Sequence, residues 1–145
     1  YITNSGFGNM TNYLLEQDRS GIAILISYGT WIETLHLATN IEKVTNKEAV
    51  YERIGEHKEV MDNIMLLLEA FKNQSGYKQL YEGAEKLKKE FDKVTITIHY
   101  AEPTTKIVDG MLMIMDNSTS EVNINDEIVN SIANQVESIR NQIIN

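Results

Sequence analysis

Apolar residues recur at alternating steps of three and four through the middle of the chain. They do so across residues 47–72 and again across residues 77–98. This spacing places one apolar seam along a helix, so we predict two helices joined by the turn at 73–76 and packed antiparallel. The two seams consist of Val50, Ile54, His57, Met61, Ile64, Leu68 and Phe71, and of Tyr77, Leu80, Ala84, Leu87, Phe91, Val94 and Ile98.

The end of the second of these helices has two interpretations. The segment Val94–Tyr100 contains Val-Thr-Ile-Thr-Ile, in which apolar and polar residues alternate. Alternation with a period of two also suits a β-strand. The pattern leaves both interpretations open at this point.

Three further helices are predicted from capping residues and apolar stripes. A short one covers residues 9–17, and a long one covers residues 20–44 and is apolar nearly all round at its start, as a buried central helix would be. The last begins at a cap on Asn125, with Asp126 and Glu127 in its first turn, where negative charge suits the helix dipole. Its apolar stripe consists of Val129, Ile132, Val136, Ile139 and Ile143.

The apolar period changes to two after Pro103. Residues 106–115 and 121–124 read as strands that flank a polar turn at residues 116–120. Because a lone hairpin is marginally stable in water, we expect it to lie against the helices.

These elements together predict a mainly α protein, an antiparallel helical bundle of about five helices with a small β-hairpin before the last helix. The 145 residues, 1–145, suit a single domain with one sizeable core. The chain begins with Tyr1 rather than Met, so we expect it to be the C-terminal part of a longer protein.

Composition and charge exclude several classes of function. The net charge of −8 would repel phosphate, so we expect no nucleic-acid partner. The longest apolar runs are five residues, against about 20 in a membrane span, so we expect no transmembrane helix. The chain has no cysteine, and it lacks a Gly-rich phosphate loop, a His-Glu-x-x-His zinc helix and a Gly-x-Ser-x-Gly elbow.

Glu33 and His36 form a Glu-x-x-His element, the unit that holds metal in di-iron bundle proteins. Such sites need a second copy, yet Ile54 and Ile96 stand three residues before His57 and His99. The pattern therefore favours a hydrogen-bonded histidine, and we predict neither a metal nor a cofactor.

Two other groups have a chemical and a structural interpretation. His57 occupies a seam position, where a polar residue can specify helix register or lie near water at a bundle end, and either is favoured over a general base. Met111, Met113 and Met115 would share one face of a strand and could offer thioethers to Cu(I). Because the intervening residues are also apolar, core or interface packing is favoured.

Trp31, Glu33 and His36 mix aromatic and polar groups on the long helix and could line a small-molecule pocket. Trp31 could equally be the central aromatic residue of the core. Periodicity does not separate these two interpretations.

Three segments, Tyr-Leu-Leu-Glu-Gln-Asp-Arg (13–19), Tyr-Gly-Thr-Trp-Ile-Glu-Thr-Leu-His-Leu-Ala-Thr (28–39) and Ile-Arg-Asn-Gln-Ile (139–143), carry a family likeness. In these motifs the chain resembles a group of uncharacterised helical proteins, often lipoproteins, of the cell envelope of Gram-negative gut bacteria. The resemblance implies a location in the periplasm or cell envelope, with a lipid anchor upstream of this chain. It implies no activity.

The sequence thus predicts a non-enzymatic structural or interaction domain of the cell envelope, with a protein partner or a second copy of itself. The first alternative is a small-ligand-binding bundle that uses Trp31, Glu33 and His36. The second is a metal-dependent enzyme built on Glu33, His36 and His57.

Overall fold

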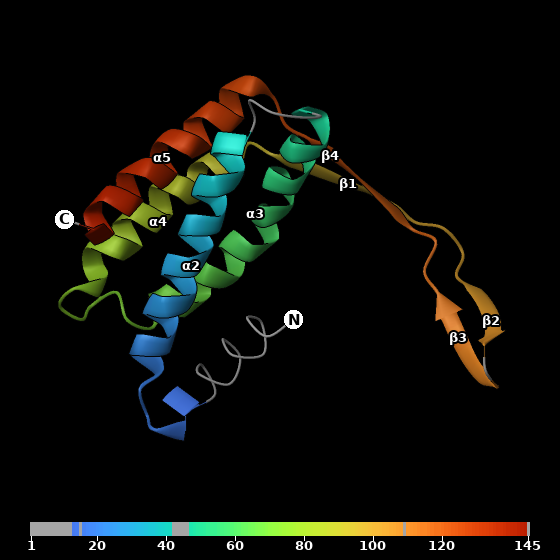
Figure 1. The fold of residues 1–145 in the computed structure, drawn as a ribbon, viewed down its shortest axis with the longest axis horizontal. Helices are drawn as coiled ribbons and strands as arrows, with labels where there is room; N and C mark the ends of the chain where they lie inside the picture. The colour runs from blue at the N-terminus through green and yellow to red at the C-terminus, as the bar shows by residue number, and fades with distance from the viewer. Residues whose placement is uncertain (1–12, 15, 42–46, 109, 145) are drawn as a thin grey trace.

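The body of the protein is a helical bundle in a computed structural model that describes every residue except 1–12, 15, 42–46, 109 and 145. Its described helices are α2 (Ser20–Ile41), α3 (Lys47–Glu69), α4 (Tyr77–Phe91) and α5 (Asp126–Ile144). Helices α2 and α4 each pack against both α3 and α5, and neighbours run antiparallel (Figure 1). The mainly α class is confirmed, with four described helices. The short helix predicted over 9–17 lies largely outside the described residues.

The predicted seams meet in one core. Residues of all four helices bury their side chains there, and α2 contributes the aromatic residues Tyr28 and Trp31. The predicted start of α5 is confirmed, because the Asn125 side-chain oxygen accepts a hydrogen bond from the backbone N–H of Ile128 at 2.9 Å. The fully buried seam residues are Ile54, Met61 and Leu68 on α3, Ala84, Leu87 and Phe91 on α4, and Val94 just after α4.

Helix α4 ends at Phe91 and does not reach residue 98. The strand interpretation of the ambiguous segment is correct, because β1 covers Thr95–His99. The ammonium group of Lys58 on α3 donates hydrogen bonds to the backbone carbonyls of Asp92 and Val94 at this transition. These carbonyls have left the helical hydrogen-bond ladder, so the lysine satisfies acceptors at the end of the helix.

A long two-stranded arm connects α4 to α5 and extends away from the bundle (Figure 1). At its base, β1 pairs antiparallel with β4 (Thr119–Asn123), and at its tip β2 (Thr104–Val108) pairs with β3 (Met111–Met115). The predicted turn at 116–120 is therefore wrong. The chain reverses between the paired residues Val108 and Met111, where Gly110 has a φ of 77°.

The correct turn has a recognisable sequence. Asp-Gly between apolar residues is a strong signal for a two-residue hairpin loop, because both central positions favour positive φ. The polar residues 116–118 also suit a turn, and the predicted turn was therefore placed there and not at Asp109-Gly110. In the structure they lie between β3 and β4, on the returning half of the arm.

The base of the arm docks on α3 at Gly55. A Cβ atom at this position would lie 2.3 Å from Val122 Cγ1 on β4 and 3.2 Å from Val94 Cγ1. Ile96 and Val122, which pair across the base, are half-buried against the core. A glycine in the middle of α3 thus permits close approach of the arm to the bundle.

We expect Gly55→Ala to destabilise the protein by about 1–3 kcal/mol, because the added methyl group must displace Val122 or overpack the arm base. Alanine's better helix propensity offsets at most about 1 kcal/mol of this cost. The matched control is Gly29→Ala on α2, where an added Cβ meets no atom within 4 Å. Urea unfolding measures both, and equal shifts of the two midpoints would contradict the docking of the arm at Gly55.

Candidate functional site

Trp31 lies in the core, where only 8% of the residue is exposed. Its ring stacks on Tyr28 and lies near Phe91, with centroid separations of 6.2 Å in both cases. The indole Nε1–H donates a hydrogen bond to His57 Nδ1 at 3.1 Å. This bond satisfies the polar atom of a residue whose ring is otherwise surrounded by apolar groups.

The same bond accounts for a histidine at a seam position. His57 accepts through Nδ1, which requires that this nitrogen carry no proton. Burial lowers the pKa of His57, with Glu56 acting weakly in the opposite direction. The neutral ring thus links α3 to α2, in keeping with the structural interpretation of His57.

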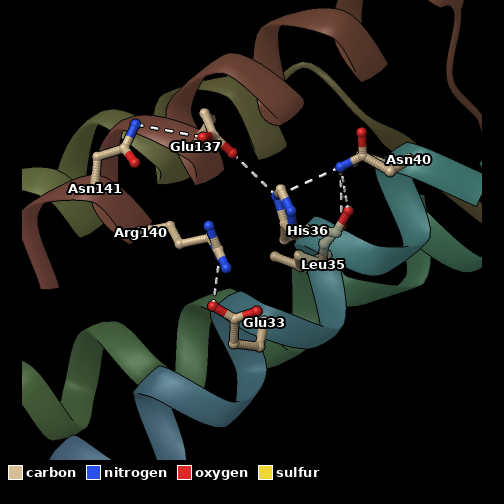
Figure 2. A network of polar contacts seen from close by, with 8 residues as sticks. Glu33, Leu35, His36, Asn40, Glu137, Arg140 and Asn141 are labelled. Carbon is tan, nitrogen blue, oxygen red and sulfur yellow. Dashed lines mark hydrogen bonds and ion pairs between the residues drawn. The ribbon is translucent and has the colours of Figure 1, made fainter. Parts of the chain in front are cut away.

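Glu33 and His36 face α5 instead. Figure 2 shows Glu33 Oε1 paired with Arg140 Nε at 2.6 Å and His36 Nδ1 paired with Glu137 Oε2 at 3.1 Å. Asn40 donates to the backbone carbonyl of His36 at 2.7 Å. The two ion pairs link α2 to α5 and fix the orientation of these helices. Because the paired side chains are partly exposed, each pair contributes little stability, about 0–1 kcal/mol.

The three residues predicted to bind a small ligand do not converge. Trp31 points toward α3 and α4, whereas Glu33 and His36 pair with side chains of α5. At about 100° per residue, Trp31 and Glu33 stand about 200° apart around the helix. Within the described residues, no group of three or more His, Cys, Asp or Glu side chains is placed to hold a metal ion.

A small apolar cavity of about 140 Å³ lies between α2 and α3 beside Trp31. Tyr28 is one of the residues that line it. The hydroxyl of Tyr28 is buried without a hydrogen-bond partner among the described residues, and desolvation raises the pKa of Tyr28. Ligand pockets usually measure about 300–1,000 Å³, so this cavity suits only a very small apolar molecule. Its lining residues are Ile24, Ser27, Tyr28, Trp31, Val60, Ile64 and Leu67.

A larger open groove of about 610 Å³ runs between the arm base and the first turns of α3 and α5. Acidic side chains dominate its wall, and Lys47 pairs with Asp126 across it at 2.8 Å. This hydrogen bond lowers the pKa of Asp126 and raises that of Lys47, so the pair stays charged near neutral pH. The acidic residues of the wall are Glu48, Glu52, Glu121, Asp126 and Glu127.

The tip of the arm, β2 and β3, carries the most unusual surface of the described structure. The register places Met111, Met113 and Met115 on one face with Val108 and Lys106, so the predicted shared face of the methionines is confirmed. Ile107, Leu112 and Ile114 lie on the opposite face, which we call the aliphatic face. The seven apolar side chains of the tip remain 39–72% exposed, in contrast to the expectation that the hairpin lies against the helices.

The comparisons with known proteins add no relative, because no family model, curated protein or solved structure matches the chain. The arm tip is the candidate site that the geometry favours. Sequence reasoning recognised the methionines as core or interface residues. It could not tell that both faces of the strand are open to solvent.

Proposed function

We propose that the chain is a non-enzymatic interaction domain of the bacterial cell envelope, in which the bundle is a scaffold and the arm tip contacts a protein. The exposed tip carries this proposal. Its seven apolar side chains are 39–72% exposed and lie on two opposite faces of one short hairpin. Grouped exposed apolar side chains of this kind usually mark an interaction site.

A protein surface suits this tip better than a lipid bilayer does. A two-stranded ribbon has two open edges, and hydrocarbon cannot satisfy their backbone N–H and C=O groups. A protein groove or strand offers both apolar contacts and hydrogen bonds to an edge. No helix within the described ranges is long and apolar enough to cross a membrane.

The envelope location rests on the likeness of segments 13–19, 28–39 and 139–143 to the helical envelope proteins. The non-enzymatic part rests on the use of the ionisable groups. Glu33 and His36 are engaged in interhelical pairs and His57 in a hydrogen bond to the core tryptophan. These contacts hold helices together, whereas the tip strands β2 and β3 pair with each other and leave their apolar side chains exposed.

A photo-crosslinking residue in place of Met113 tests the proposal in the native host. We expect a discrete protein adduct from this position, because a partner that covers the tip must contact its central residue. The matched control places the same residue at Lys78, which is exposed in the first turn of α4, at the end of that helix away from the arm. Equal adducts from both positions, or none from Met113, would contradict the proposal.

A further inference from the structure

The two edges of the arm tip differ in how well they are protected against further strand pairing. The β2 edge follows Pro103 and has Lys106 at its centre. Charged residues, above all lysine, and proline are the usual features that prevent an exposed edge from pairing with another strand. The β3 edge, Met-Leu-Met-Ile-Met, has no charge, proline or glycine, and in the described part of the chain β3 pairs only with β2.

The unpaired backbone groups of β3 belong to two residues. In a hairpin with a two-residue loop, the pair next to the loop exchanges both hydrogen bonds, and the pattern then alternates. Met111, Met113 and Met115 therefore direct their N–H and C=O groups toward β2, given the register. Leu112 and Ile114 direct theirs outward, along the free edge.

The sequence of β3 complements itself under a two-fold axis. If two copies of β3 run antiparallel and centre on Met113, Leu112 faces Ile114, Met111 faces Met115 and Met113 faces itself. All five residues are paired, and the outward groups of Leu112 and Ile114 exchange hydrogen bonds with those of the second copy. A two-fold interface requires this self-complementarity.

Charge does not oppose this contact. The tip, residues 104–115, has one lysine and one aspartate and is formally neutral, whereas the whole chain carries −8. In the centred register Asp116 falls opposite Gly110, so no like charges meet. The arm extends away from the bundle (Figure 1) and spans on the order of 40 Å. This length is far more than the screening length of about 8 Å at physiological salt, so the acidic bundles of the two copies stay apart.

We propose that two copies of this chain join through β3, edge to edge and antiparallel about Met113, into one four-stranded sheet. The inference rests on the proposed function and names its partner. The joined sheet has a continuous methionine face and a continuous aliphatic face, each built from both copies. The contact is smaller than a standard interface, so we expect a dimer that forms reversibly with concentration.

Single cysteines test the register, because the natural chain has none. Met113→Cys should form a disulfide-linked dimer under mild oxidation, since facing residues of a non-hydrogen-bonded pair have Cα atoms about 4.5 Å apart, within disulfide range. Met111→Cys and Met115→Cys are the matched controls. Each alone should cross-link at least about tenfold less, and an equal mixture of the two should cross-link with each other, because they face one another in this register.

Sedimentation of the cysteine-free chain gives the second readout. Its average mass should rise with concentration from 16.5 kDa toward twice that value. A constant monomer mass, or equal cross-linking of all three single-cysteine variants, would overturn the inference. An adduct between the Met113 photo-crosslinker and a different protein would overturn the dimer but support the proposed function. The absence of any adduct would contradict both the dimer and the proposed function.

Discussion

Replacing Ile107, Leu112 and Ile114 together with threonine should weaken the contacts of the arm and leave the helical bundle as stable as before. These side chains form the aliphatic face of the tip and are 67–72% exposed, so the bundle loses almost no buried surface. Threonine keeps the β-propensity of these positions, which preserves the strands themselves. We expect the free energy of unfolding to change by no more than about 0.5 kcal/mol.

The effect on association should be larger than the effect on stability. Leu112 and Ile114 of the two copies form two facing pairs across the joined β3 edges, and such cross-strand pairs contribute about 0.2–1 kcal/mol each. Loss of both pairs predicts about 2- to 30-fold weaker association. Ile107 lies on β2, one strand away from the contact, so its replacement tests whether a partner covers the aliphatic face as well. The adduct from a photo-crosslinker at Met113 and the concentration dependence of the sedimentation mass measure this loss.

The control for this triple variant changes exposed apolar residues elsewhere. Leu37 on α2 and Leu66 on α3 are 60% and 73% exposed, and glutamine suits a helix at both positions. Leu37→Gln with Leu66→Gln should retain the tip adduct in full. If the control loses the adduct as well, general surface hydrophobicity and not the tip is responsible for the contact.

The helices could be predicted because their signal is local and repeated. A seam that returns every three or four residues needs only one neighbouring helix to bury it, and α3 and α4 supply one another. The strand over Thr95–His99 was ambiguous because Val94 continues the helical seam into the core while Ile96 already follows the alternation of the arm. Lys58, 36 residues away from Val94 in sequence, contributes to ending the helix there.

The site was harder to predict, because it depends on where the arm extends and not on its residue types. The sequence pattern of an apolar strand is the same whether both of its faces are buried or both are exposed to solvent. The separation of Trp31 from Glu33 and His36 could have been derived from helix geometry alone. Their partners Glu137 and Arg140 could not be predicted, since they are more than 100 residues away in the sequence.

The bundle provides a body of fixed shape, and the arm holds the tip away from it. Interhelical contacts such as the bond between Trp31 and His57 give the body a fixed shape. The docking of Val122 against Gly55 transmits that shape to the arm, because the base strands cannot shift without leaving the core. A tip held at a distance in a defined direction can be covered by a partner without any rearrangement of the bundle.

Trp31→Ala should destabilise the bundle by about 3–5 kcal/mol, the second large effect we expect. The truncation removes the ring that packs on Tyr28 and Phe91 and leaves a cavity between α2, α3 and α4. It also removes the donor to His57 Nδ1. Since domains of this size have about 5–15 kcal/mol of stability, the variant should unfold at a far lower urea concentration or fail to fold.

The conservative variant Trp31→Phe separates packing from hydrogen bonding. Phenylalanine keeps most of the aromatic contacts but has no N–H for His57, so we expect a loss of about 1–2 kcal/mol. Urea unfolding at neutral pH measures both variants, with the exposed Leu66→Ala as a control that should shift little. The outcome also bears on the ligand-binding alternative. A Trp31 that lined a ligand site would tolerate alanine with little loss of stability, whereas a core Trp31 that bonds His57 must give the order alanine, phenylalanine, wild type in rising stability.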